Sequence, residues 1–179
     1  MISVKSNTDL EKLRAAGRIA GRALKLAGES VRAGMTTKEL DKIVHDYIVS
    51  CGATPSFLGY GGFKGSACIS INNEVIHGIP SSKRKIADGD IVSVDVGAYY
   101  NGFHGDTCAT FAVGHISDEA KKLLEVTEAS LYAGIDAAVV GARMGDVSHT
   151  VEEYCVSRGY AVVKQYCGHG IGRGMHESP

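Results

Sequence analysis

Two apolar segments, each interrupted by one aspartate, flank the pair Asn101-Gly102 in the middle of this 179-residue chain. An Asn-Gly pair between apolar segments is the strongest short signal for a two-residue β-hairpin turn, because both turn positions need φ > 0. If these residues form the turn, Gly97 lies opposite Asp106, and Asp95 shares that face of the sheet. We therefore predict an antiparallel hairpin that carries Asp95 and Asp106 as diagonal neighbours.

A carboxylate within an apolar strand is unfavourable unless a positive charge compensates it. Two such groups on one face raise each other's pKa, whereas a divalent cation between them keeps both ionised. Much later, the segment Gly168-His169-Gly170 supplies an imidazole, a common ligand beside carboxylates, framed by glycines that permit close approach. The residues alone thus predict a metal site of Asp95, Asp106 and His169, with a solvent-facing pair of carboxylates as the alternative.

The composition excludes several classes of protein. A formal net charge of −1, with 44% hydrophobic and 22% charged residues, is ordinary for a globular domain and offers no basic surface for nucleic acid. No apolar run is long enough to span a membrane, and the N-terminus lacks the apolar core of a signal peptide. Five cysteines without a Cys-x-x-Cys spacing indicate reduced thiols, mostly in the core, and a cytoplasmic protein.

Helical and strand-like patterns follow one another in two rounds. Helices are expected at about residues 8–31, 36–52, 117–133 and 146–158, and strands at about 67–71, 91–98, 103–113 and 161–165. We expect capping boxes at Thr8–Glu11 and Thr36–Glu39, and Ser117 as the cap of the third helix.

Apolar positions of the second helix recur 107 residues later in the fourth, so that Leu40 matches Val147. Each of these helices follows a longer one, and the pattern predicts an internal repeat of two related halves. In this alignment Pro179 corresponds to Asn72, which precedes the acidic hairpin of the first half. The second half therefore stops before a matching hairpin, and we expect the chain to be a truncated form.

Other catalytic patterns are absent or open to two interpretations. The glycines at 168–174 fail the Gly-x-Gly-x-x-Gly test, and no Gly-x-Ser-x-Gly motif is present, so a metal-activated water is the best candidate nucleophile. His77 and His176 stand in loops, where they either hydrogen-bond a substrate and its tetrahedral intermediate or make only local bonds. The aromatic, glycine-rich stretch Pro55–Phe63 either lines an apolar pocket or packs over the core.

Taken together, these motifs resemble those of a known family. The matching segments are Pro55–Tyr60, Cys68–Pro80, Val92–Asp95, Gly102–Thr107 and Gly168–Pro179. In this order they resemble the bacterial type I methionine aminopeptidases, which have the pita-bread fold. The resemblance implies an α+β fold with two pseudo-symmetric α/β halves around a curved antiparallel sheet. It implies a single domain over residues 1–179, with an N-terminal half at about 1–113 and an incomplete second half at about 114–179.

The resemblance also assigns a site that holds two divalent ions. Asp95 would chelate one ion, Asp106 would bridge both, and His169 would bind the other, and Co, Mn, Fe, Zn and Ni all suit such donors. His77 and His176 would contact the substrate and its intermediate. The methionine side chain would lie among Phe57, Tyr60, Phe63, Cys68 and Met175.

The implied reaction is removal of the initiator methionine from new polypeptides when the second residue is small. The implied setting is the cytoplasm, with an N-terminal peptide as substrate, transient association with the ribosome and a monomeric enzyme. The family's two glutamate ligands lie beyond the motif that contains His176 and Glu177, where this chain ends, and Glu177 is not one of them. We therefore expect a C-terminally truncated fragment with room for one ion in place of two, and its own activity is open. The alternatives are a proline-directed peptidase of the same fold and a non-catalytic module of that fold that binds peptides.

Overall fold

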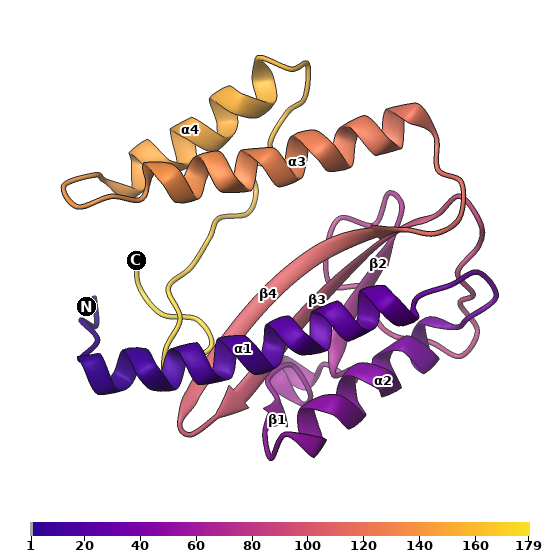
Figure 1. Cartoon of the computed structure of the whole chain (residues 1–179), viewed down its shortest axis with the longest axis horizontal. Helices are drawn as coiled ribbons and strands as arrows, with labels where there is room; N and C mark the ends of the chain where they lie inside the picture. The colour runs from indigo at the N-terminus through magenta and orange to yellow at the C-terminus, as the bar shows by residue number, and fades with distance from the viewer. Residues whose placement is uncertain (1) are drawn as a thin grey trace. The chain divides into compact units, whose positions relative to one another are not determined.

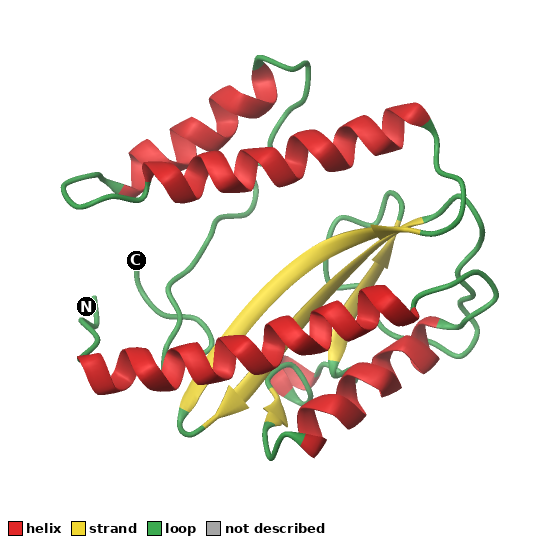
Figure 2. Ribbon diagram, viewed as in Figure 1, coloured by secondary structure: helices red, strands yellow, loops and turns green. Residues whose placement is uncertain are grey.

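The computed structural model describes residues 2–179 and has an α+β architecture, as expected (Figures 1 and 2). The chain divides into two compact units, which are described separately. The first comprises Met1–Ile116 and His169–Pro179, and the second comprises Ser117–Gly168. The expected halves at about 1–113 and 114–179 stay a prediction.

A four-stranded antiparallel sheet forms the centre of the first unit. The strands are β1 (Thr54–Pro55), β2 (Ala67–Ile71), β3 (Ile91–Tyr100) and β4 (Phe103–Ala112). Strands β1 and β2 both pair with β3, and β4 pairs with β3 along its entire length. The turn between β3 and β4 has φ of 51° at Asn101 and 85° at Gly102, as the Asn-Gly pair predicts.

Helices α1 (Asn7–Ser30) and α2 (Thr37–Ser50) pack against one face of this sheet (Figure 2). Every second side chain of β3 points into this core and is fully buried: Val92, Val94, Val96 and Ala98. Helix α1 contributes small side chains that are also fully buried: Ala16, Ala20, Ala23 and Ala27. Because β3 alternates with period two, the opposite face carries its polar residues, among them Asp95.

The two helices differ in how well their starts were predicted. The box at Thr36 is confirmed, because the Thr36 hydroxyl accepts from the Glu39 amide at 3.2 Å and the Glu39 carboxylate accepts from the Thr36 amide at 2.7 Å. The box at Thr8–Glu11 is wrong. Ser6 caps α1 in partnership with Asp9, which accepts from the Ser6 amide at 3.1 Å. An aspartate three residues after a serine closes the same reciprocal pair, so α1 begins earlier than expected.

The second unit consists of α3 (Asp118–Ala137) and α4 (Met144–Val156), which pack against each other. Ser117 caps α3 as predicted, accepting from the Ala120 amide at 3.1 Å. The expected strand at 161–165 is wrong, because residues 161–163 have no regular structure and residues 164–165 form a turn. A strand is stabilised by a neighbouring strand, and none lies beside it in this part of the chain.

Two further expectations concern the whole chain. No helix among residues 2–179 is both long enough and apolar enough to cross a membrane. The five cysteines are free thiols, but only Cys68 and Cys155 are buried, so the expectation that most lie in the core is wrong.

Candidate active site

The hairpin β3–β4 places two carboxylates on the face of the sheet that α1 and α2 leave uncovered. Gly97 lies opposite Asp106, and Asp95 lies opposite Cys108, so Asp95 and Asp106 are diagonal neighbours. This is the register that the turn at Asn101 predicted. A slip by one residue would have sent one carboxylate to the other face, so the turn determines that both belong to one site.

The electrostatics of this pair indicate uncompensated negative charge. Burial raises the pKa of Asp95 to about 7, and the charge of Asp106 and a hydrogen bond to it act in the same direction. The amide of Val96 opposes this rise only weakly. A divalent cation beside the pair would compensate the charge and keep both carboxylates ionised.

His169 approaches this pair from the loop after the second unit. Its Nε2 atom lies 3.8 Å from Oδ2 of Asp106, and the two side chains are 32% and 22% exposed. Its Nδ1 atom is 2.9 Å from the carbonyl oxygen of Gly170. Because a carbonyl oxygen only accepts, Nδ1 carries a hydrogen, and in the neutral ring the lone pair then lies on Nε2, the nitrogen on the side of Asp106. This is the tautomer and the backbone support that are typical of a histidine that binds a metal through Nε2.

The side chains of Asp95, Asp106 and His169 are therefore of the chemical types that bind a divalent ion. They do not, however, form a complete metal site. Two carboxylates and one imidazole are ligands that first-row divalent metals accept. The structure brings Asp106 together with Asp95 and with His169. Within residues 2–179, however, no group of three or more His, Cys, Asp or Glu side chains has the geometry to hold a metal ion.

His176 lies beside His169, as expected for a residue that acts on the same substrate. The ring centroids of His169 and His176 are 4.2 Å apart. The Nδ1 atom of His176 is hydrogen-bonded to the hydroxyl of Tyr60 at 3.0 Å. Tyr60 was predicted as a pocket residue, and its link to His176 is an additional feature that the sequence does not indicate.

An apolar cluster adjoins the carboxylates. Phe57, Cys68 and Met175 are buried together, and Phe63 packs against them. Cys68 of β2 lies directly opposite Asp95 of β3, so the apolar cluster and the acidic pair lie next to each other on the same face of the sheet. Burial raises the pKa of the Cys68 thiol to about 12, with the nearby carboxylates adding to the rise, so the thiol stays protonated and acts in packing. Four of the five predicted pocket residues thus lie together, and Tyr60, which is 54% exposed, lies at His176.

His77 is the predicted site residue that the structure does not bring to the others. It is exposed in the loop after β2 and has a positive φ of 59°, which is uncommon for a residue with a side chain. Gly78 next to it is fixed, because its carbonyl accepts from the Ile69 amide at 2.8 Å and its amide donates to Ser70 at 3.1 Å. The role of His77 stays a prediction.

His104 is a residue of this region that the sequence reasoning missed. It lies on β4 two positions before Asp106, so the period of a strand could have placed it on the same face. Its Nδ1 is 2.8 Å from the hydroxyl of Ser56, and burial lowers its pKa. Its amide donates to the carbonyl of Gly172 at 2.8 Å, which ties β4 to the loop that carries His169.

A cavity of about 700 Å³ lies elsewhere, against α2. It contains none of the predicted site residues. Its lysines lie among carboxylates of equal number, so it has no strong excess of charge. The chemistry is therefore concentrated at the uncovered face of the sheet.

An antiparallel sheet that presents paired aspartates to a loop histidine is consistent with a metal-dependent hydrolase. The chain belongs to metallopeptidase family M24, which matches residues 11–179.

Within this family, its relatives include methionine aminopeptidases. The methionine aminopeptidase of Clostridium acetobutylicum is 51% identical over 179 residues, which is 100% of this chain and 72% of the relative. Methionine aminopeptidase 1 of Bacillus subtilis is 48% identical with the same coverage.

Solved structures agree with this placement. The methionine aminopeptidase of Thermotoga maritima superposes with a TM-score of 0.98 at 39% identity, covering 100% of this chain and 72% of that one. The X-Pro aminopeptidase of the same organism superposes less well, with a TM-score of 0.80 at 25% identity, covering 98% of this chain and 49% of that one. The pita-bread fold is thereby confirmed, and the proline-directed alternative is not favoured.

Proposed function

We propose that this chain is a metal-dependent aminopeptidase that removes the initiator methionine from polypeptides whose second residue is small. The observation that carries the proposal is the position of Asp95, Asp106 and His169 beside an apolar cluster. A site for an N-terminal methionine needs both parts, namely charged groups for the reacting end and an apolar pocket for the side chain. The similarity to methionine aminopeptidases over the full chain supports the same reaction.

The two aspartates and His169 would hold the metal, with Asp106 in the central position because it neighbours both other ligands. A divalent ion there would supply a Lewis acid that lowers the pKa of the attacking water and polarises the scissile carbonyl. The described chain offers three ligands, which is enough for one ion at most, and the two-ion arrangement of the family needs further ligands. Co, Mn, Fe, Zn and Ni are the candidate metals.

His176 would stabilise the negative charge that develops on the carbonyl oxygen. If the Tyr60 hydroxyl donates to Nδ1 of His176, the hydrogen of the neutral ring lies on Nε2, where it can be donated to an oxyanion. His77 would contact the peptide nitrogen from the loop after β2. Both histidines act as hydrogen-bonding groups in this proposal and not as metal ligands.

The apolar cluster would receive the methionine side chain. Phe57 and Phe63 offer aromatic rings, against which a thioether packs favourably, and Met175 is itself flexible and polarisable. Tyr60 would close the cluster on the side of His176. The residues at 57, 60, 63, 68 and 175 therefore set the preference for methionine in the first position.

The substrate is the N-terminal peptide of a protein, and the setting follows from that substrate. We place the activity in the cytoplasm, where new chains emerge, with transient contact with the ribosome and a monomeric enzyme. Sedimentation of the chain with and without ribosomes tests both points. Stable dimers, or no enrichment with ribosomes that carry nascent chains, would contradict them.

Hydrolysis of a Met-Ala-Ser peptide by the 179-residue chain, with Co²⁺ or Mn²⁺ added, tests the function. We expect release of free methionine, which chelation of the metal abolishes, and no release from Asp106→Asn. Cleavage of an X-Pro peptide but not of Met-Ala-Ser would favour the proline-directed alternative. Peptide binding without any cleavage would favour the non-catalytic module.

A further inference from the structure

The segment 169–177, here called the histidine loop, carries both His169 and His176 but has little backbone support. A bridge joins Gly170 and Glu177 at its base. The Gly172 amide donates to the Gly174 carbonyl at 3.0 Å, and the Gly172 carbonyl accepts from the His104 amide. No regular helix or strand fixes the loop. The positions of the two histidines therefore depend on side-chain contacts.

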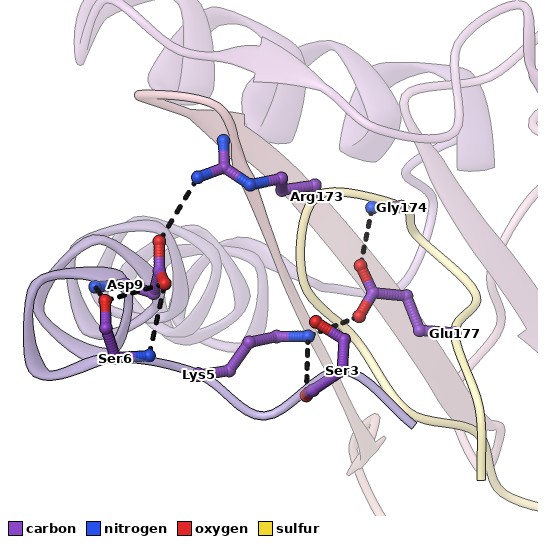
Figure 3. A network of polar contacts seen from close by, with 7 residues as sticks. All are labelled: Ser3, Lys5, Ser6, Asp9, Arg173, Gly174 and Glu177. Atoms are coloured by element: carbon purple, nitrogen blue, oxygen red, sulfur yellow. Dashed lines mark hydrogen bonds and ion pairs between the residues drawn. The ribbon is translucent and has the colours of Figure 1, made fainter. Parts of the chain in front are cut away.

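The first such contact joins the loop to the N-terminal segment (Figure 3). One oxygen of the Glu177 carboxylate accepts from the Gly174 amide at 3.0 Å, and the other accepts from Nζ of Lys5 at 2.5 Å. The Lys5 and Glu177 side chains are only 16% and 19% exposed. Lys5 also donates to the carbonyl of Ser3 at 3.3 Å. Glu177 thus closes the loop and links it to residue 5 at the same time.

The second contact joins Arg173, at the tip of the loop, to Asp9 in the first turn of α1. Nη2 of Arg173 is 3.2 Å from Oδ1 of Asp9, which Ser6 holds through the capping box of α1. The guanidinium of Arg173 also lies over the ring of Phe103, 4.6 Å from its centroid. Arg173 therefore connects the tip of the loop to both α1 and β4.

The packing around Gly172 indicates that these contacts are built into the fold. A Cβ atom at this position would lie 2.6 Å from Oε1 of Glu177 and 2.7 Å from Cε of Lys5. A side chain at position 172 would have to displace the ends of the Lys5 and Glu177 side chains, so the ion pair packs directly against this glycine.

We propose that Lys5 and Asp9 are positioning residues that clamp the histidine loop, so that His169 stays at Asp106 and His176 stays at Tyr60. Neither clamp residue touches the reacting atoms. The N-terminal segment would thus be part of the site although it lies 164 and 172 residues away from its partners in the sequence. The inference deepens the proposed function and rests on it.

Loss of the contacts made by Lys5 and Asp9 should displace the two histidines more than the apolar cluster. A misplacement of about 1 Å in a catalytic group can lower the rate by about 100-fold. Phe57, Phe63 and Cys68 lie outside the loop, so substrate affinity depends less on the clamp. Loss of the clamp should therefore weaken metal binding through His169 and lower kcat through His176, with a smaller change in KM.

The test compares Lys5→Met, Lys5→Arg and Lys25→Met in the full 179-residue chain. Lys25 is the matched control. It lies on α1 and makes an exposed ion pair of 3.8 Å with Glu29, which is on the same helix. Trypsin cleavage after Arg173 under native conditions reports opening of the loop. Calorimetric titration with Mn²⁺ reports the metal site, and hydrolysis of Met-Ala-Ser reports kcat and KM. Asp9→Asn serves as a second variant, because it keeps the trypsin site and removes the charge that faces Arg173.

We expect Lys5→Met to speed cleavage after Arg173 by about tenfold or more and to weaken Mn²⁺ binding by about tenfold, while Lys5→Arg and Lys25→Met resemble the wild type. Unchanged cleavage in both Lys5→Met and Asp9→Asn would overturn the clamp. Faster cleavage with unchanged Mn²⁺ affinity and unchanged kcat would show that the contact holds the loop without positioning the site. If the wild type binds no Mn²⁺, the proposed metal site fails, and the cleavage rates alone decide the clamp.

Discussion

The β3–β4 hairpin and the histidine loop supply opposite sides of the same site, but they are held in different ways. The hairpin is fixed by a local turn at Asn101-Gly102, a continuous ladder of strand pairs and a buried apolar face. The histidine loop has one bridge and one backbone hydrogen bond to β4, and it otherwise depends on side chains that come from the far end of the chain. The aspartates are therefore positioned by local sequence, and the histidines by long-range contacts.

The largest effect is expected where the hairpin meets α1. A Cβ atom at Gly105 would lie 2.4 Å from the backbone nitrogen of Gly17 and 2.5 Å from the carbonyl carbon of Ala16. Because helix backbone cannot move aside easily, Gly105→Val should destabilise the chain by about 3 kcal/mol, as measured by urea unfolding.

Gly17→Ala is the matched control on the opposite side of this contact. A Cβ atom at Gly17 meets nothing within 4 Å, so this change should be neutral or stabilising by about 0.5–1 kcal/mol. A Gly105→Val variant as stable as the wild type would contradict the close packing of the hairpin on α1.

The two histidines of the loop should separate metal binding from turnover. His169→Ala should weaken Mn²⁺ binding by more than about 100-fold, because it removes a ligand. His176→Ala should leave the Mn²⁺ affinity nearly unchanged and lower kcat by about 100-fold, because it removes a donor to the oxyanion. Calorimetry and peptide hydrolysis measure these effects, and equal losses of metal affinity in both variants would argue against distinct roles.

The aspartate pair gives the hairpin a characteristic dependence on pH. Because the pKa of Asp95 is raised to about 7, the folded chain keeps a proton that the unfolded chain releases near pH 4. The unfolded state binds fewer protons between these values, so stability from this group is present at low pH and is lost as the pH rises through about 7.

Asp95→Asn isolates this effect, because asparagine does not titrate. The free energy of unfolding of the wild type, relative to that of Asp95→Asn, should fall by on the order of 3 kcal/mol between about pH 4 and pH 7. Thermal unfolding across this range measures it without metal. A constant difference between the two proteins would mean that neither burial nor Asp106 raises the pKa of Asp95.

The smallest expected effects on stability concern the N-terminal caps of α1 and α2. Ser6→Ala and Thr36→Ala should each lower stability by about 1 kcal/mol, since each removes a hydroxyl that accepts from the first turn. Only Ser6→Ala should also speed trypsin cleavage after Arg173, because Ser6 orients the Asp9 carboxylate that pairs with Arg173. Equal cleavage rates in Ser6→Ala and Thr36→Ala would mean that the cap of α1 does not influence the histidine loop.

What the sequence could predict follows the same division. The register of Asp95 and Asp106 was predictable because the turn residues and the apolar alternation act over a few positions. The cap of α1 was misplaced because Ser6 with Asp9 and Thr8 with Glu11 both fit the spacing of a capping box, and the local sequence does not decide between them. The strand at 161–165 was wrong because a strand pattern does not say whether a partner strand is present.

Contacts between distant parts of the chain left no local signal. The ion pair of Lys5 and Glu177 spans 172 residues, and no spacing rule relates the two positions. The same holds for the bond between Tyr60 and His176. His104 was the exception, since its position two residues before Asp106 on one strand was a signal that could have been used.

The most direct test of the account is whether one divalent ion is held by the hairpin and the histidine loop together. Titration of the isotope-labelled chain with paramagnetic Mn²⁺, followed by NMR, measures which residues lie near the ion. We predict that the ring signals of His169 and the backbone signals around Asp95 and Asp106 broaden together at low Mn²⁺ concentration, and that Asp106→Asn abolishes the effect. Broadening at the hairpin without His169, or at neither, would contradict the claim that these two regions form one metal site.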